Sequence, residues 1–191
     1  MGRPSHRSGN LPAESTTFVG RRRELGEIRT KLATARLVSL VGPGGVGKTR
    51  LGLRIGTDLA RGFADGAWFV ELAEVRDPGL VPNAVLAALD LRDQAVARPV
   101  EILAAHLKTR QLLLVLDNCE HVLAAAGRLV ADILRAAPSV RVIATSREPL
   151  QVAGEQVIPV TPLELPPAGG SEPLAHLRQN EEIALFTKGE T

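Results

Sequence analysis

The sequence predicts a three-layer α/β fold in which helices flank a mainly parallel five-stranded sheet. Three observations lead to this prediction. Short aliphatic runs, such as the five consecutive residues 112–116 within 111–118 (QLLLVLDN), have the composition of strands buried on both faces. These runs alternate with amphipathic segments of helical spacing, which is the pattern of a parallel sheet covered by helices. A glycine-rich turn separates the first strand from the helix after it.

The individual elements follow from local patterns. Leu25, Ile28 and Leu32 recur at helical spacing and predict an amphipathic helix before the first strand. Pro99 introduces a later helix in its first turn. The complete prediction places helices at 21–35, 48–61, 79–89, 99–109 and 121–137, and strands at 36–41, 67–72, 111–118, 140–146 and 156–160.

The composition is that of a soluble domain. Of the 191 residues, 45% are hydrophobic and 23% are charged. No apolar run approaches the roughly 18 residues of a membrane span, and the N-terminus lacks the apolar segment of a secretory signal. The single cysteine, Cys119, excludes an internal disulfide framework and a cysteine-rich zinc site. We therefore expect a cytoplasmic protein without a membrane segment.

Positive charge is concentrated near the N-terminus. Residues 1–50 hold ten Lys and Arg against three Asp and Glu, although the net charge of the whole chain is +2. Such an excess can indicate nucleic-acid binding. With no Tyr, one Trp and four Phe, however, the sequence shows no aromatic platform for stacking single-stranded bases. We attribute the charge mainly to phosphate binding and a solvated helix face.

Residues 42–49 (GPGGVGKT) match the P-loop pattern GxxxxGK[ST] in full, between a predicted strand and helix. The glycines permit positive φ angles and let backbone N–H groups approach phosphate oxygens. Lys48 would place a charge between the β- and γ-phosphates, and Thr49 a hydroxyl on Mg²⁺. The alternative, a chance glycine-rich turn, leaves the flanking strand and helix unexplained. The predicted nucleotide-binding residues here are Gly42, Gly44, Gly45, Val46, Gly47, Lys48, Thr49 and Arg50.

Asp117 ends a buried strand, and ligands of parallel sheets bind beyond the carboxyl ends of the strands. A nucleotide-bound Mg²⁺ needs a nearby carboxylate and keeps several waters, so we assign Asp117 to the metal through water, together with Thr49. The alternative role is a cap of the next helix.

One strand lies in sequence between the P-loop strand and the Asp117 strand, and another follows. This order resembles the ASCE branch of P-loop ATPases, in which the later strand inserts between those two.

Rapid ATPases of that branch usually carry a glutamate directly after this aspartate, where the present sequence has Asn118. An asparagine can orient a water but cannot accept its proton, so we expect slow hydrolysis or none. Glu120 is the weaker candidate for a base. We interpret Cys119 as a small buried residue that packs in the core.

Arg147 follows the predicted strand at 140–146, so it belongs to the same edge of the sheet. An arginine there could pair with a γ-phosphate and distinguish a triphosphate from a diphosphate. The alternative is a surface arginine paired with Glu148.

Together, the segments FVGRRREL, VGPGGVGKTRL, WFVEL, LLLVLDNCEH and VIATSREPL resemble the nucleotide-binding domain of STAND-class ATPases. The closest resemblance is to the NB-ARC-like domain of large bacterial transcriptional regulators. It implies a resting state with bound ADP, exchange for ATP, and a rearrangement that drives signalling or DNA binding by an attached domain. The motif implied to contact the adenine maps onto Phe18, Val19, Gly20 and Arg21, although Arg22 stands where such motifs often carry an acid.

We expect a flexible basic leader at 1–16 and a P-loop nucleotide-binding domain at 17–165. A Pro/Gly-rich linker and the truncated start of a further helix, near Gln179, would occupy 166–191. Members of the similar family continue into helical and winged-helix domains, which this sequence does not contain. We therefore expect protein partners or missing C-terminal domains, and DNA contact only through domains absent here.

The leading interpretation is a switch module that binds ATP or ADP with Mg²⁺. An active ATPase or small-molecule kinase is the second hypothesis, against which Asn118 argues. A GTPase is disfavoured because no NKxD guanine signature follows the sheet. A pure DNA-binding regulator is supported only by the basic leader, and a regulator fragment without output remains an alternative.

Overall fold

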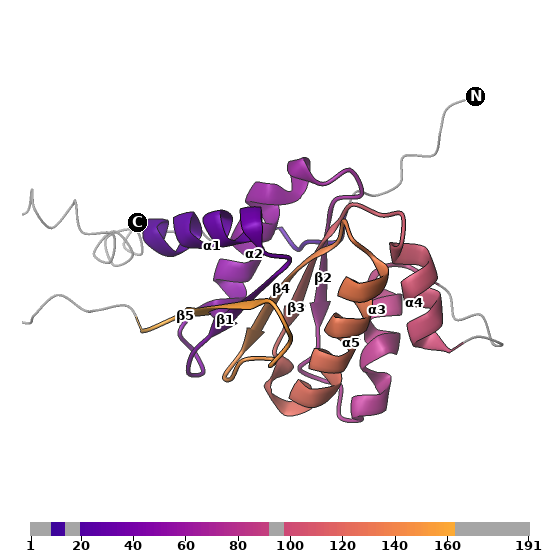
Figure 1. Cartoon of the computed structure of the whole chain (residues 1–191). Coiled ribbons are helices and arrows are strands. Elements are labelled where there is room, and N and C mark those ends of the chain that lie inside the picture. The colour runs from indigo at the N-terminus through magenta and orange to yellow at the C-terminus, as the bar shows by residue number, and fades with distance from the viewer. Residues whose placement is uncertain (1–8, 14–19, 92–97, 163–191) are drawn as a thin grey trace, which may run out of the picture.

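A computed structural model describes residues 9–13, 20–91 and 98–162, and these form one parallel sheet with helices on both faces (Figure 1). The strand order is β2-β3-β4-β1-β5, with every neighbouring pair parallel. The predicted fold class and strand number are confirmed, as is the insertion of a later strand between those of the P-loop and Asp117. The strands are β1 (Leu37–Val41), β2 (Ala67–Glu71), β3 (Leu113–Asp117), β4 (Arg141–Ser146) and β5 (Glu155–Pro159).

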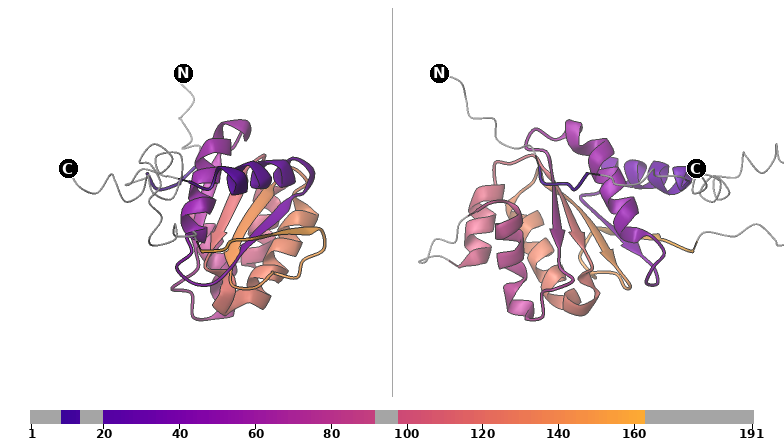
Figure 2. Two further views of the ribbon diagram at one scale, coloured as in Figure 1. Left: turned by 90° about the vertical axis from the view of Figure 1, so that its left-hand side faces the viewer. Right: turned by 180° about the vertical axis from the view of Figure 1, so that it is seen from behind.

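The helices divide into two groups. Figures 1 and 2 show α1 and α2 on one face of the sheet and α3, α4 and α5 on the other. All five predicted helices are present. Their bounds are α1 (Arg22–Thr34), α2 (Lys48–Leu59), α3 (Val81–Ala88), α4 (Pro99–Leu107) and α5 (Leu123–Ala136).

The sheet separates two hydrophobic clusters because successive residues of a strand point to opposite faces. On β3, Leu113 and Val115 pack with α1 and α2, whereas Leu114 and Leu116 belong to the cluster under α3, α4 and α5. The helix α1 buries Leu25, Ile28 and Leu32 as its spacing predicts. Burial on both faces explains why the strands read as continuous apolar runs.

All five helices are somewhat shorter than predicted, and 3₁₀ turns adjoin three of them. The chain continues beyond α2 in a 3₁₀ turn (Ala60–Gly62), and a 3₁₀ turn (Pro78–Leu80) precedes α3. A third 3₁₀ turn (Cys119–Val122) takes up the predicted start of α5, because Asn118 adopts a left-handed conformation at φ 58° and the chain turns sharply there. The helix predicted near Gln179 lies outside the described residues.

Parallel register brings the carboxyl ends of the central strands to one edge. Val41 of β1 is level with Ser146 of β4 and Pro159 of β5, and Asp117 of β3 is level with Glu71 of β2. The sheet edge thus gathers the residues that the sequence predicts to carry chemistry.

In the part of the chain described here, no helix has the length and apolarity needed to cross a membrane.

Gly127, in the middle of α5, is required by close packing. A Cβ at this position would lie 2.7 Å from the backbone oxygen of Leu150. We expect Gly127→Ala to lower the free energy of unfolding by about 1–3 kcal/mol, as overpacking of a core does. Gly26→Ala in α1 is the matched control, because a Cβ there meets nothing within 4 Å.

The control should gain about 0.5–1 kcal/mol from higher helix propensity. Chemical denaturation measures both changes. Equal effects of the two substitutions would contradict the packing of α5 described here.

Candidate nucleotide-binding site

The glycine-rich loop connects β1 to α2 and is held against the sheet at its start. The N–H of Gly42 donates to the Ser146 carbonyl at 3.2 Å, and a Cβ on Gly42 would lie 2.2 Å from the Val160 carbonyl oxygen. Further along, Gly45 and Gly47 adopt φ angles of 79° and 87°. Such angles are readily adopted only by glycine, so the sequence pattern and the backbone geometry agree.

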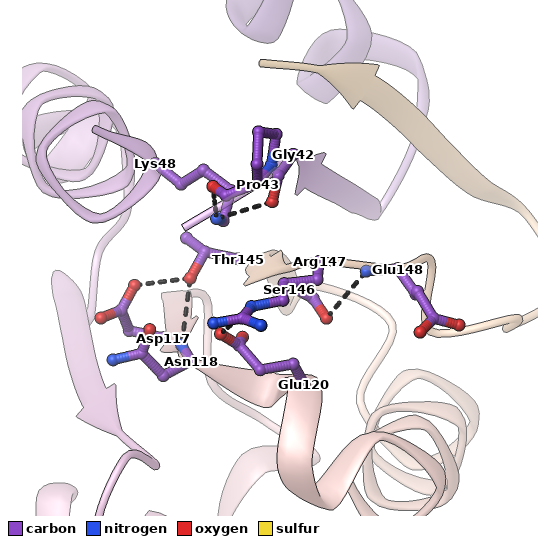
Figure 3. A network of polar contacts seen from close by, with 10 residues as sticks. All are labelled: Gly42, Pro43, Lys48, Asp117, Asn118, Glu120, Thr145, Ser146, Arg147 and Glu148. Atoms are coloured by element: carbon purple, nitrogen blue, oxygen red, sulfur yellow. Dashed lines mark hydrogen bonds and ion pairs between the residues drawn. The ribbon is translucent and has the colours of Figure 1, made fainter. Parts of the chain in front are cut away.

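Lys48, the first residue of α2, is 7% exposed and folds back over the loop. Its Nζ donates to the carbonyl oxygens of Gly42 and Pro43, each at 2.8 Å (Figure 3). The ammonium group is thereby placed beside the loop, and it satisfies its hydrogen bonds with backbone acceptors that an anionic ligand could replace. Such a ligand would suit this partly buried cation better than neutral carbonyls do.

Asp117 is 1% exposed and binds two hydroxyl groups from different elements. Its Oδ2 accepts from Thr49 Oγ1 at 3.0 Å, and its Oδ1 accepts from Thr145 Oγ1 at 2.5 Å. The pair of Thr49 and Asp117 therefore converges at the end of the P-loop. Hydroxyl and carboxylate oxygens are hard ligands of the kind that Mg²⁺ prefers, so the residues present fit a nucleotide-bound magnesium ion.

Thr145 is a site residue that the sequence argument missed. It is fully buried near the end of β4, and its hydroxyl also accepts the backbone N–H of Asn118 at 3.0 Å (Figure 3). The Thr145 hydroxyl thus fixes both the orientation of the Asp117 carboxylate and the start of the turn that begins at Asn118. The available signal was a hydroxyl residue near the end of a strand that borders the Asp117 strand.

The turn Cys119–Val122 brings Glu120 toward the loop that follows β4. Arg147 Nε lies 3.5 Å from Glu120 Oε1, so the arginine pairs with Glu120 rather than with Glu148. The backbone N–H of Glu148 instead donates to Ser146 Oγ at 3.3 Å. The Arg147 guanidinium also lies close to the P-loop. A Cβ built on Gly44 would be 3.5 Å from its Nη2 atom.

Two predicted adenine contacts fall at the entry to α1. Arg21 is buried, and its guanidinium donates to the carbonyls of Val46 and Thr161 at 2.8 and 2.9 Å and to the Glu24 carboxylate. It therefore connects the P-loop to the segment after β5. Gly20 adopts φ 84° beside it. Phe18 and Val19 lie outside the described residues.

Two further residues named from the sequence are Arg50 and Cys119. Arg50 is exposed in the first turn of α2. Burial and the negative charges of Asp117 and Glu120 raise the pKa of the Cys119 thiol to about 12. A fully buried, protonated thiol is unreactive, which agrees with a packing role.

Comparison with known proteins assigns this arrangement to a family. The sequence model described as "Novel STAND NTPase 1" matches residues 11–152. The chain belongs to the novel STAND NTPase 1 family. The predicted STAND-class resemblance is therefore confirmed.

Curated relatives of this STAND chain include proteins of Mycobacterium and Streptomyces species. An uncharacterized protein of Mycobacterium tuberculosis is 41% identical over 150 residues, covering 78% of this chain and 38% of the relative. A protein of the same species named as an HTH-type transcriptional regulator is 44% identical over 128 residues, covering 67% of this chain and 14% of the relative. The regulatory protein AfsR of Streptomyces griseus is 30% identical over 72% of this chain and 15% of its own length. The STAND chain thus spans well under half of these relatives.

Solved structures support the fold. A STAND protein with a tetratricopeptide repeat sensor from Pyrococcus horikoshii aligns with a TM-score of 0.57 at 16% identity, covering 97% of this chain and 30% of that one. A Walker-type ATPase of Pyrococcus abyssi aligns with a TM-score of 0.50 at 15% identity, over 74% of this chain and 54% of that one. At such low identity, these matches establish the P-loop ATPase fold alone.

Thr145→Val tests the role of the buried hydroxyl, since valine has nearly the same shape but no donor. We expect it to lower the free energy of unfolding by about 1–3 kcal/mol, because one Asp117 oxygen and the Asn118 N–H lose their partner. Thr57→Val is the control, because its exposed hydroxyl bonds only within α2, to the Leu53 carbonyl.

Urea denaturation of both variants measures the difference. If Thr145→Val is as mild as Thr57→Val, the hydroxyl does not hold Asp117 in place.

Proposed function

We propose that this chain is the nucleotide-binding switch module of a STAND-type, NB-ARC-like regulator, and that it holds ATP or ADP with Mg²⁺ at the P-loop. The observation that carries the proposal is the convergence of Lys48, Thr49 and Asp117 around one loop. A cation for phosphate, a hydroxyl and carboxylate for magnesium, and a glycine turn with positive φ angles form a complete set of phosphate-binding parts.

Each residue has a role in this proposal. Backbone N–H groups of 44–49 bind phosphate oxygens, while the positive end of α2 adds its partial charge. Lys48 exchanges its carbonyl partners for phosphate oxygens, and Thr49 and Asp117 orient the magnesium ion and its waters. The bound ion supplies charge neutralisation to the phosphates. Gly20 and Arg21 position the segment proposed to contact the adenine.

Slow turnover is part of the proposal. Asn118 occupies the position after Asp117, and its amide can orient a water but cannot take its proton. Glu120 is bound to Arg147 by an ion pair. A site that retains its nucleotide suits a switch, in which the identity of the bound nucleotide sets the conformation of the attached domains.

The regulatory context comes from the relatives. Proteins named as an HTH-type transcriptional regulator and as AfsR share this module within much longer chains. We propose that residues 17–165 form the module in the cytoplasm, that 166–191 are a linker, and that DNA or protein partners are bound by other domains. Part of the predicted leader is attached to this module, because Asn10 Nδ2 donates to the Phe69 carbonyl of β2 at 2.9 Å.

A working ATPase of the ASCE class is the second candidate. One observation favours it: Glu120 Oε2 is buried and, in the described part of the chain, has no hydrogen-bond partner. A carboxylate oxygen without a hydrogen-bond partner keeps its capacity to accept a proton.

Lys48→Ala tests the phosphate site directly. Losing a charge-assisted hydrogen bond of about 1.5–3 kcal/mol should weaken Mg-ADP binding by about 10- to 150-fold. Lys31→Ala is the control, because this lysine pairs with Glu27 on the surface of α1. Isothermal titration calorimetry gives both affinities, and an unchanged affinity in Lys48→Ala would refute the assignment.

Asn118→Glu tests why turnover is slow. If only the proton acceptor is missing, the substitution should raise the rate of ATP hydrolysis by about 10²-fold or more, which is the usual worth of a general base. Asn118→Gln is the matched control, because it imposes the same strain at a left-handed backbone position without adding a carboxylate.

Phosphate release in single-turnover assays measures both variants. If Asn118→Glu is no faster than Asn118→Gln, hydrolysis is limited by something other than the base.

A further inference from the structure

We infer that Glu120 sets the preference of this site between a diphosphate and a triphosphate, because it holds Arg147 in a position that a γ-phosphate must compete for. This inference rests on the proposed function and adds a residue that determines nucleotide specificity. Glu120 acts through Arg147, so it is a positioning residue rather than a catalytic one.

The two side chains form an ion pair near the contact of Asp117 with Thr145. Arg147 Nε lies 3.5 Å from Glu120 Oε1 (Figure 3). The same guanidinium is close to Gly44 of the P-loop. Arg147 therefore already stands between the acidic turn after β3 and the loop that would bind the phosphates.

The arginine is the partner that can move. Its side chain is 65% exposed, whereas that of Glu120 is 26% exposed. Glu120 also belongs to a short turn whose neighbouring residues, Cys119 and Val122, are buried in the core. A long exposed side chain can swing toward a new anion, but a carboxylate on an anchored turn cannot follow it.

The present pair is weak enough to be exchanged. Its separation is long for an ion pair, and the second carboxylate oxygen, Oε2, is buried without a hydrogen-bond partner among the described residues. Arg147 is mostly exposed, so solvent screens the pair, and ion pairs at a protein surface change an equilibrium by about two- to fivefold. Pairing of arginine with phosphate is charge-assisted and often bidentate, so a γ-phosphate would replace the carboxylate. A diphosphate has no group at that place and leaves the pair closed.

The consequence is a site biased toward the diphosphate. Each triphosphate that binds must open the contact between Arg147 and Glu120, and this cost is absent for the diphosphate. Removing the charge of Glu120 frees the arginine in advance and should favour the triphosphate selectively.

The test is a double-mutant cycle read by calorimetry, with Mg-ADP and a slowly hydrolysed Mg-ATP analogue as the probes. Glu120→Gln should raise the affinity for the triphosphate about two- to fivefold relative to the diphosphate. Arg147→Ala should lower triphosphate affinity, and Glu120→Gln should have almost no further effect in the Arg147→Ala background. Glu148→Gln is the matched control, since its carboxylate neighbours Arg147 in sequence but does not pair with it.

Any of the following results would overturn the inference. An equal gain from Glu120→Gln with and without Arg147 would mean that the glutamate simply repels phosphate. An equal change for both nucleotides, or the same gain from Glu148→Gln, would mean that it has no part in telling them apart. If the wild-type chain is folded but binds neither probe, the proposed function itself fails. If it binds both and Glu120→Gln changes neither affinity, only the inference about Glu120 and Arg147 fails.

Discussion

The buried carboxylate of Asp117 joins three strand ends at the carboxyl edge of the sheet. It ends β3, accepts the hydroxyl of Thr145 from β4, and accepts the hydroxyl of Thr49 from the helix that continues the β1 loop. The contact with Thr145 requires that β4 lie directly beside β3, as the order β2-β3-β4-β1-β5 provides. The topology and the site therefore depend on each other.

Electrostatics explains why this arrangement suits a ligand. Burying a carboxylate is costly unless its oxygens are hydrogen-bonded, and Asp117 at 1% exposure is satisfied by two hydroxyl groups rather than by a cation. Lys48 is likewise satisfied by neutral carbonyls. Opposite charges thus lie on either side of the loop, each held by weak neutral partners. A magnesium–phosphate group carries complementary charges for both, so binding would exchange neutral hydrogen bonds for charge-assisted ones.

Much of this could be read from the sequence because the signals are local. Aliphatic runs predicted the five strands, and the glycines of 42–47 predicted the positive φ angles at Gly45 and Gly47. Contacts between distant segments left no such signal. The bond from Thr145 to Asp117 and the pair of Arg147 with Glu120 join residues 27 or 28 positions apart, and they follow only from strand order. The family resemblance singled out Arg21, but its bonds to Val46 and Thr161 could be found only from the fold, because these partners are distant in sequence.

The most direct test of the central claim is the thermal stability of the folded chain with Mg-ADP, Mg-ATP and Mg-GTP. At about 100 times its dissociation constant, a nucleotide that binds only the folded chain should stabilise it by roughly 2.7 kcal/mol, which raises the melting temperature by several degrees. The account predicts this rise with both adenine nucleotides and a smaller one or none with Mg-GTP. A melting temperature that is indifferent to all three, or that responds to Mg-GTP alone, would contradict it.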